Sequence, residues 1–463
     1  MRTSIRLFLM LAVPVLSIPS PFCRAEDEAK QKSYLLKSGS PVGHINRIKA
    51  ELEVGGDLKL LSGGKQITAP MSVAGKVEYD EKLLEADAKS LANRRSVRYY
   101  SLAEATIKIN KDELEPDLRD SRRIVEAAVL AGTPTLFSPQ GSLSGEELDL
   151  IELPGNSLFL DLLLPGDEVK VGKSWQPSDT LIAAVLGIDA VSKNDVQCTL
   201  SEVQHEFAIV NVGGTVNGAI QGVTTELEMK ARFRFDLKQQ QITYFTMAMR
   251  EKRSIGHVGP GLDVTAKLKV EITPLETSEK LTDEAVAEIK LEPKPELTAV
   301  EFDSTSGGFR LTHDRRWHPT NVQPATLVLR MVDRGELVAQ CNVSSLAKLP
   351  DGKRDNLTDF RGDVQQALAK NFVQFEDAGQ ATNAKGFQVL HAYVQGKVQD
   401  LPIEWRYYLV SDLKTGRRMA FAFTLEQSLI DRLGTSDRDL IDKVELFEPI
   451  PESAAKPKAT QKK

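Results

Sequence analysis

Cysteine is scarce in this sequence, with three residues among 463. Cys23 lies in a leader that we expect to be removed, which leaves Cys198 and Cys341 in two different predicted domains. A disulfide framework is therefore excluded, and two buried free thiols are the simpler expectation, with a bridge between them left open. Common catalytic signatures are missing too, since there is no G-x-S-x-G, H-E-x-x-H or C-x-x-C motif and no EF-hand loop. We expect neither a cofactor nor a metal ion, and an enzyme only if scattered Ser, His and Asp side chains come together.

The sequence also lacks an excess of basic over acidic residues. The formal net charge is −6 at pH 7, and it becomes −9 when Arg2, Arg6 and Arg24 are removed with the leader. An acidic chain lacks the electrostatic footprint that binding to a phosphate backbone requires, so nucleic acid is not an expected partner. Beyond the leader no apolar run approaches the length of about 18 residues that a membrane helix needs, so we expect no transmembrane segment in the mature chain.

The N-terminus has the order of a secretory signal peptide. Two arginines precede the apolar stretch 7–16, and a cleavage-like sequence follows at 23–25. We expect a signal peptide over residues 1–25, cleavage after Ala25, and export to the periplasm or out of the cell. Lipidation of Cys23 is the alternative, but residues 20–22 are a poor approach for that processing.

Composition divides the rest of the chain. Residues 33–275 and 297–450 keep an apolar pattern, whereas 276–296 is rich in Glu and Lys and contains two prolines. We interpret 276–296 as a charged linker with one helical turn at about Asp283–Ile289. Residues 451–463 form a basic tail that we expect to be disordered. The chain is thus predicted to have two domains of ordinary size, with few contacts across the linker.

The first domain alternates apolar and polar residues. The alternation is longest at Leu227–Leu237 and returns at Val264–Ile272, which predicts long strands with one wet face. Strands of this length must twist and curl, so we predict a curved antiparallel sheet. Further strands are predicted at Ile48–Val54, Val73–Tyr79 and Ala105–Ile109.

Two segments of this domain have a helical pattern instead. Leu118–Val129 is expected to form a helix that Gly132 stops, and a short apolar run suggests a second helix near Leu181–Leu186. The domain as a whole is predicted to be mostly β.

The second domain contains segments with helical periodicity and segments with the alternation of strands. A helix is predicted at Phe360–Phe372 behind a capping Thr358, and another at Leu440–Phe447 behind the capping pair Ser436 and Asp439. Alternation predicts six strands, so that helices cover an antiparallel sheet in an α+β sandwich. The strands are Phe309–Thr312, Thr326–Asp333, Val338–Val343, Phe387–Val398, Ile403–Val410 and Met419–Thr424.

Short motifs accompany these elements in a fixed order: Gly308–Leu311, Arg316-Trp317, Trp405–Tyr408, Gly416–Arg418 and Phe421–Thr424. With the two helices, this order resembles the PsbP-like family, which includes extrinsic photosystem proteins and bacterial relatives, over about residues 297–450. The resemblance implies an antiparallel sheet covered by helices and a binding or assembly role. The family has no shared catalytic centre, so no functional residue is carried over. The first domain, with motifs such as Val171–Trp175 and Gly259–Asp263, is similar to uncharacterised exported proteins of planctomycete-type bacteria, which implies a host and no activity.

The densest cluster of polar functional side chains consists of His313, Asp314, Arg315, Arg316 and His318. Two histidines five residues apart on one strand point to opposite faces, so they share a metal only if a turn intervenes, for which Arg315-Arg316 is suited. A third ligand is not evident. We expect a surface hairpin with Trp317 as its core anchor, and metal or acid-base chemistry at the histidines is the alternative.

A run of small and apolar residues lies on one side of one predicted strand: Val212, Gly214, Val216, Gly218, Ile220 and Gly222. Glycine there permits a sharp bend or lets another group lie against the sheet. A bend in a curled sheet is the simpler interpretation. The functional alternative is a groove that accepts an acyl chain or a partner strand.

Three functions stay open at this point. The leading hypothesis is an exported, non-enzymatic binding or assembly protein whose partner is unknown. The first alternative is a carrier of lipid or another hydrophobic ligand on the concave face of the N-terminal sheet. The second is a hydrolase or metal-dependent enzyme centred on His313 and His318.

Overall fold

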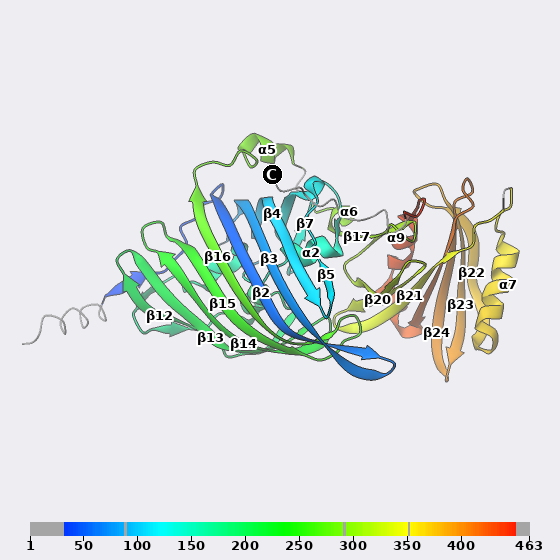
Figure 1. Cartoon of the computed structure of the whole chain (residues 1–463), viewed down its shortest axis with the longest axis horizontal. Helices are drawn as coiled ribbons and strands as arrows, with labels where there is room; N and C mark the ends of the chain where they lie inside the picture. Colours follow the sequence, from blue (N-terminus) through cyan, green and yellow to red (C-terminus); the bar gives the residue numbers. More distant parts are fainter. Residues whose placement is uncertain (1–31, 88–89, 290–292, 351, 451–463) are drawn as a thin grey trace, which may run out of the picture.

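The computed structural model describes residues 32–87, 90–289, 293–350 and 352–450. The expected signal peptide and the expected basic tail lie outside the described residues. Strands dominate the described chain and form two large antiparallel sheets, which follow one another along the long axis of the molecule (Figure 1). None of the helices in this part of the chain is long and apolar enough to cross a membrane.

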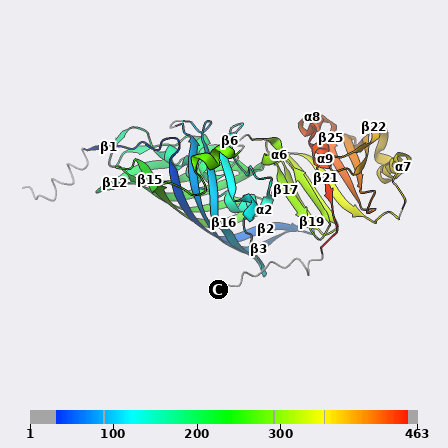
Figure 2. The ribbon, with the colours of Figure 1, turned by 90° about the horizontal axis from the view of Figure 1, so that it is seen from above.

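The larger sheet belongs to the first domain and has 13 strands. It twists and curls as the long alternating strands predicted (Figures 1 and 2). Two short strands, β5 (Asp112–Leu114) and β11 (Ala190–Asn194), pair with β4 and β13. In spatial order the main path is β10 (Ser174–Trp175), β12 (Gln197–Gln204), β13 (Phe207–Ile220), β14 (Val223–Asp236), β15 (Gln241–Arg253), β16 (Gly261–Leu275), β2 (Ile45–Ser62), β3 (Lys65–Glu85), β4 (Arg95–Ile109), β6 (Ile124–Leu130) and β7 (Thr133–Phe137).

The predicted alternation is confirmed in β14, where Leu227, Met229 and Phe233 are buried and the charged residues between them are exposed. β16 likewise contains the predicted strand at 264–272. β2 and β3 contain two further predicted strands but are much longer, with 18 and 21 residues. Their full length was missed because glycines and a proline interrupt the apolar alternation toward the turn that joins them.

The helix predicted at Leu118–Val129 is wrong. This segment holds one 3₁₀ turn, η1 (Asp120–Arg122), followed by the hairpin of β6 and β7. Four successive residues of β6 are buried, because both faces of this strand are covered, and such a run lacks the alternation of a half-exposed strand. Gly132 belongs to the hairpin turn, where it and Ala131 adopt φ values of 86° and 49°.

Helices fill the inner face of the curled sheet. They are α2 (Gly145–Ile151), α3 (Ser157–Leu160) and α4 (Asp179–Leu186), with the 3₁₀ turn η2 (Asp161–Leu163) between the last two. α4 confirms the helix expected near 181–186. A short two-stranded sheet of β1 (Ser33–Leu35) and β9 (Glu168–Lys170) lies beside them. The core that helices and sheet share includes Leu148, Phe159, Val185, Phe233 and Phe245.

The second domain is built on a seven-stranded antiparallel sheet. α7 (Leu357–Leu368) packs on one face, and α8 (Ile430–Leu433) and α9 (Ser436–Asp442) pack on the other, so that two separate cores lie on the two sides. In spatial order the strands are β19 (Trp317–Gln323), β20 (Thr326–Asp333), β21 (Glu336–Leu346), β25 (Arg418–Glu426), β24 (Leu401–Ser411), β23 (Gln388–Val398) and β22 (Phe372–Thr382).

All six strands predicted in the second domain are confirmed, but both helices differ in their ends. α7 is capped by Asn356 in place of Thr358, since Asn356 Oδ1 accepts a hydrogen bond from the Asp359 amide. It ends at Leu368, and Phe372 starts the unpredicted strand β22. α9 is preceded by Thr435, and the side chain of Ser436 turns to other partners.

A four-stranded sheet joins the two domains, in the order β26 (Glu445–Leu446), β18 (Phe309–His313), β17 (Val300–Ser304), β8 (Leu143–Ser144). β8 comes from the first domain and runs parallel to β17. The linker holds α5 (Asp283–Glu288), close to the predicted helical turn, and α6 (Pro295–Thr298). Its first part is fastened to the N-terminal sheet, because Lys82 Nζ donates to the carbonyl of the buried Leu281.

Candidate functional site

The most polar part of the N-terminal core is centred on the buried Arg98 of β4. Register places Glu81 of β3 directly opposite Arg98, and the Arg98 Nε donates to Glu81 Oε1 over 2.7 Å. The same oxygen accepts the hydroxyl of Ser96, and Glu81 Oε2 accepts that of Ser157 in α3. Arg98 Nη2 also reaches Asn156 Oδ1 at 2.5 Å. The network therefore ties the chain at the start of α3 to the sheet.

Two tyrosines complete this network. Tyr79 and Tyr100 face each other across β3 and β4 with ring centroids 4.8 Å apart, and the guanidinium of Arg98 lies 4.8 Å from the Tyr79 centroid. Burial raises the pKa of both phenols. Burial alone would lower the pKa of Arg98. The Glu81 carboxylate and the two tyrosines raise it by more than burial lowers it, so the pKa of Arg98 lies above its ordinary value. Arginine and carboxylate thus form a buried ion pair, and the phenols stay neutral.

Two small cavities flank the network. The larger one offers about 50 Å³ to the centres of water-sized molecules and is lined by Glu81, Ser157, His44 and Gln241; the smaller offers about 20 Å³ beside Arg98. Gln241 Nε2 is buried and has no hydrogen-bond partner among the described residues. One water needs about 10–15 Å³ measured in this way, so the larger cavity can hold a few waters, one of them on Gln241. The space is far too small for an acyl chain.

The second domain has a similar buried arginine. Arg406 of β24 donates to Glu404 Oε1 at 2.6 Å and to Asp437 Oδ1 of α9 at 3.0 Å. Asp437 is fully buried and also accepts the Tyr408 hydroxyl at 2.5 Å, and Tyr408 in turn contacts Tyr393. Burial, together with the neighbouring Asp437 carboxylate, raises the pKa of Tyr408. Here too a buried charge network holds a helix to a sheet.

The predicted histidine cluster lies at the domain junction and not on a free surface hairpin. A turn does separate the histidines, since His313 ends β18 and His318 belongs to β19, and Trp317 is a core anchor that is 1% exposed. His313 Nδ1 contacts the carbonyl of Asp314, while its Nε2 has no partner among the described residues. In this part of the chain no group of three or more His, Cys, Asp or Glu side chains is placed to hold a metal.

The arginines of this cluster hold the two domains and the turn in place. Arg315 donates to the carbonyls of Thr298 and Leu136 and pairs with Glu152, so it links the second domain to β7 and α2. Arg316 pairs with Asp314 at 3.0 Å. His318 lies near Gln221 in the turn between β13 and β14, with Nδ1 3.5 Å from Gln221 Nε2. These residues are structural groups of the junction.

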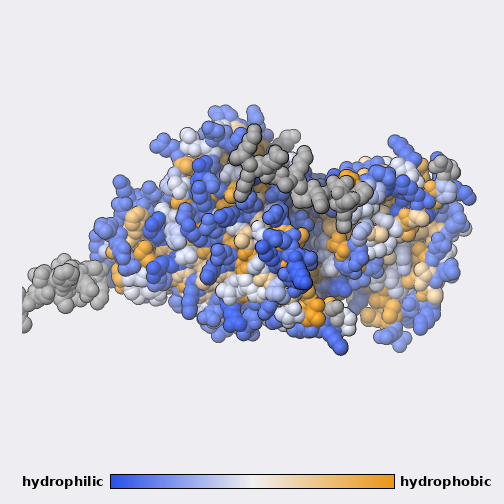
Figure 3. All heavy atoms as spheres, in the orientation of Figure 1, coloured by the Kyte–Doolittle hydropathy of each residue, from blue (hydrophilic) through white to orange (hydrophobic). Residues whose placement is uncertain are grey.

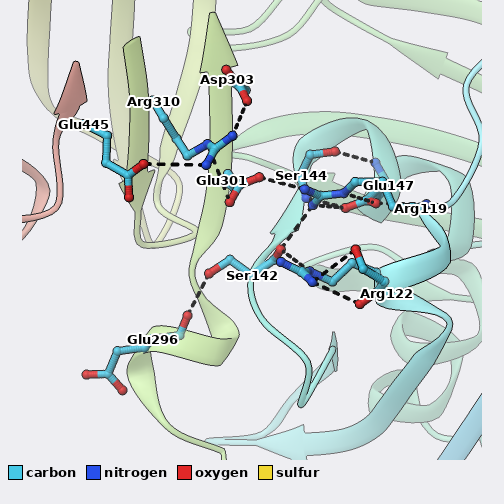
Figure 4. A network of polar contacts seen from close by, with 11 residues as sticks. Arg119, Arg122, Ser142, Ser144, Glu147, Glu296, Glu301, Asp303, Arg310 and Glu445 are labelled. Atoms are coloured by element: carbon cyan, nitrogen blue, oxygen red, sulfur yellow. Dashed lines mark hydrogen bonds and ion pairs between the residues drawn. The ribbon is translucent and has the colours of Figure 1, made fainter. Parts of the chain in front are cut away.

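Figure 4 shows the second set of contacts across the junction. Arg119 of the first domain donates two hydrogen bonds to Glu147, each of 2.6 Å, and one of 2.8 Å to Glu301 on β17. Hydrogen bonding to Glu147 and Glu301 raises the pKa of Arg119 above its ordinary value. Glu147 also caps α2. Arg310 continues the network to Asp303. The junction is thus made of paired charges and a shared sheet.

The glycine run lies in β13 and in the turn that follows it, and main-chain atoms of other segments pack closely against its glycines. A Cβ at Gly214 would lie 2.6 Å from the Asp195 carbonyl oxygen, and one at Gly218 would lie 2.4 Å from that of Ala190. The chain from 188 to 196 therefore lies against this side of β13, while Val212 and Val216 are buried in the core. Gly222 contacts Gly335 of the second domain. Ile220 is partly buried. The space that a groove would need at Gly214 and Gly218 is filled.

Cys198 and Cys341 are free and lie in the separate cores of the two domains. Burial raises the pKa of both thiols, to about 12 for Cys198. Neither thiol is therefore prepared as a nucleophile at neutral pH.

The β2–β3 hairpin is the part of the first domain that extends beyond its neighbours. The last residue of β2 paired with β16 is Lys59, and the first residue of β3 paired with β4 is Met71. Beyond these points residues 60–62 of β2 pair only with 65–67 of β3, and residues 68–70 pair with 57–59 of β2, while the Pro70 carbonyl also accepts a hydrogen bond from the Asn110 amide. Leu61 is 65% exposed and Ile67 46%. Hydrophobic surface is visible at this lower end of the sheet, beside the second domain (Figure 3).

The comparisons with known proteins are remote. No family model matches the chain, and no curated protein matches it. Among solved structures, the cyanobacterial PsbP protein of Synechocystis sp. PCC 6803 is 14% identical over 32% of this chain and 92% of its own, with a TM-score of 0.27. A Pseudomonas aeruginosa protein of unknown function, described as a putative regulator, is 10% identical over 33% of this chain and 98% of its own, with a TM-score of 0.23. Similarity at this level assigns no function.

Proposed function

We propose that this chain is an exported binding or assembly protein without a catalytic centre, and that the β2–β3 hairpin is its binding surface. The observation that carries the proposal is the overhang of residues 60–70, with exposed apolar side chains and unpaired strand edges on both sides. Exposed edges and apolar side chains are normally covered or charged in a monomer, and where they are not, a partner is the usual reason.

The apolar surface continues from the hairpin onto the neighbouring strands. Leu60 and Ile67 are direct cross-strand partners on the same face as Met71. Farther along this face, Val73 pairs with Ile107 of β4, which pairs with the exposed Leu114 of β5. The turn is built by Gly63 and Gly64, both with positive φ, which brings β2 back as β3 within two residues. A partner that covers the hairpin can therefore cover a continuous apolar face.

The closed state of the polar clusters also supports binding over catalysis. Arg98 and Arg406 are each bound by internal partners, and the cavities beside this first network are of water size. The PsbP-like relation of residues 297–450 stays part of this proposal, and it rests on the order of strands and helices. It agrees with a binding or assembly role, in which the second domain and the hairpin belong to one body.

Site-specific crosslinking tests the proposal. A photoreactive residue at position 65 of the full chain, which is exposed on the same face of β3 as Ile67, should give a crosslinked protein product in its own host that Ile67→Ser reduces at least fivefold. The matched control carries the photoreactive residue at Gln239, which is exposed in the turn between β14 and β15 and should give no such product. Equal products at both positions, or a product at 65 that Ile67→Ser leaves unchanged, would contradict hairpin binding.

A further inference from the structure

The two edges of the seven-stranded sheet are protected to very different degrees. β19 contains Pro319 and a bulge between Pro319 and Asn321, and its first residues lie at the domain junction. β22 at the other edge has 11 residues and bulges only in its first half, at 372–374 and 375–377. From Ala378 to Thr382 it is regular, and it contains no proline and no charge there. Proline, lysine and bulges are the usual means of blocking a sheet edge, and this half of β22 lacks all three.

The turn after β22 shows which main-chain groups of this strand face away from β23. The amide of Asn383 donates to the Phe387 carbonyl, so the main-chain groups of Asn383 face β23. Because successive residues of a strand direct these groups to opposite sides, those of Ala378, Gln380 and Thr382 face away from β23. No main-chain hydrogen bond from another described segment reaches these three residues. The side chains of Gln380 and Thr382 are exposed.

The surroundings of this edge indicate what fits there. Ala381 leaves room for larger side chains on one face, while Gly379 on the same face is already covered by the ring of His391, since a Cβ there would come within 2.7 Å of His391 Cε1. His391 is held by Asp377 at 3.1 Å. β22 carries two acidic residues, Glu376 and Asp377, and no basic one. An added strand with apolar side chains and a basic residue near Glu376 would complement both features.

We propose that an extended segment of a protein partner adds to β22 beside Ala378–Thr382 as an eighth strand of this sheet. The main-chain groups of Gln380 and Thr382 bind the segment, the small side chain of Ala381 accommodates one of its side chains, and Glu376 attracts its basic residue. The proposal rests on the proposed binding function for its class of partner, but it concerns a surface in the other domain. Main-chain pairing gives affinity here, and the alternate side chains give specificity.

A matched pair of substitutions at one position tests strand addition. Gln380→Pro removes an outward amide and blocks pairing, whereas Gln380→Ser keeps both main-chain groups. Proline at an outward position of an edge strand is compatible with the sheet, and the melting curve of the full chain checks this. Both variants and the wild type are screened against a display library of unstructured 12-residue peptides. Enriched peptides should carry alternating apolar residues and a basic end, lose at least tenfold in affinity for Gln380→Pro, and stay within about threefold for Gln380→Ser.

A second measurement does not depend on the variants folding. In the wild-type chain the amides of Gln380 and Thr382 should exchange more slowly when an enriched peptide is bound. Peptides that bind Gln380→Pro as well as the wild type, or unchanged exchange at these amides, would overturn the proposal. A concentration-dependent dimer of the free chain that Gln380→Pro abolishes would replace the partner by a second copy and also overturn it. The crosslinks at position 65 are independent of this edge, so either surface can fail alone.

Discussion

Each of the two domains holds a helix to its sheet with one buried arginine and two tyrosines. In the first domain Arg98 pairs with a single carboxylate, Glu81, and reaches the start of α3 through the neutral Asn156 and Ser157. In the second domain Arg406 lies between two carboxylates, Glu404 and Asp437, and the second of these belongs to the helix itself. The first network is thus balanced in charge, while the second has an excess negative charge that a tyrosine hydroxyl helps to stabilise.

The recurrence of this arrangement in two unlike folds bears on function. A buried cluster of Arg, carboxylate and Tyr would be a natural candidate for an active site. Here no buried side-chain polar atom of either cluster lacks a hydrogen-bond partner, and both clusters lie where a helix meets a sheet. We therefore interpret them as structural connections and assign binding to the exposed edges.

Because the two networks differ in their number of carboxylates, we expect substitutions in them to lower the free energy of unfolding by different amounts. Arg98→Met leaves the Glu81 carboxylate buried without a countercharge, and we expect a loss of about 3–5 kcal/mol in the free energy of unfolding. The double variant Glu81→Gln, Arg98→Met removes both charges and should recover most of this loss. Denaturant unfolding of the full chain measures both. A double variant as unstable as the single one would show that the pair is not the source of the stability.

Removal of one carboxylate in the second domain should cost less. In Asp437→Asn the side-chain oxygen can still accept from Tyr408, and Arg406 keeps its pairing with Glu404. We expect a loss of about 1–3 kcal/mol, because the hydrogen bond from Arg406 Nη1 to residue 437 is lost while no charge is left unpaired. The same unfolding experiment checks the order of the two losses. If Asp437→Asn proved more destabilising than Arg98→Met, the charge argument would fail.

Among the described residues, neither network has a hydrogen bond to a histidine side chain, whereas the side chains of His313 and His318 lie at the domain junction. Burial lowers the pKa of His313 and of His318 from 6.5, and the neighbouring His313 lowers that of His318 further. Asp314 opposes the shift of both histidines, and Asp189 opposes that of His318. As the pH falls, His313 and His318 therefore take up protons at a higher pH in the unfolded chain than in the folded chain. The stability from neutral imidazoles is complete above about pH 6.5 and is lost as the pH falls below it. Melting temperature against pH should show this loss, and His313→Gln should reduce it; the same slope in the variant would remove His313 from the explanation.

The smallest effect is expected at Gly379. Gly379→Ala places a Cβ against the His391 ring, which must move and weaken its contact with Asp377, but the ring is 21% exposed and can shift toward solvent. We expect a loss of less than about 1 kcal/mol, as for other surface substitutions. A larger loss in denaturant unfolding would mean that β22 is packed more tightly than its exposure indicates.

Much of this architecture could be predicted from the sequence, because apolar and polar residues alternate in strands that have one solvent-exposed face. β14 and β20 are examples, and so is the helix α4 with its apolar run. Prediction failed where both sides of a strand are covered, as in β6, because burial on both faces erases the alternation. It failed at β22 for the opposite reason, since an exposed edge strand has no regular apolar face.

The sites were harder to predict than the strands. Arg98 stands at an inward position between Ser96 and Tyr100, and this break in an apolar face was the available signal for the buried network. The histidine cluster was found, but its place at the junction depends on contacts with Gln221 and Leu136, which are far away in the sequence. Only tertiary structure brings these residues together.

Amide hydrogen exchange tests the central claim most directly, namely that this chain binds through exposed edges and not in its polar interior. The full chain purified from its own host, with whatever it has bound, is compared with the same chain produced alone in a foreign host. We predict slower exchange in the host material along 60–70 of the hairpin or at Gln380 and Thr382 of β22, with no change in β4 around Arg98. Slower exchange confined to β4 and α3, with both edges unchanged, would show that a ligand occupies the interior and would contradict the account.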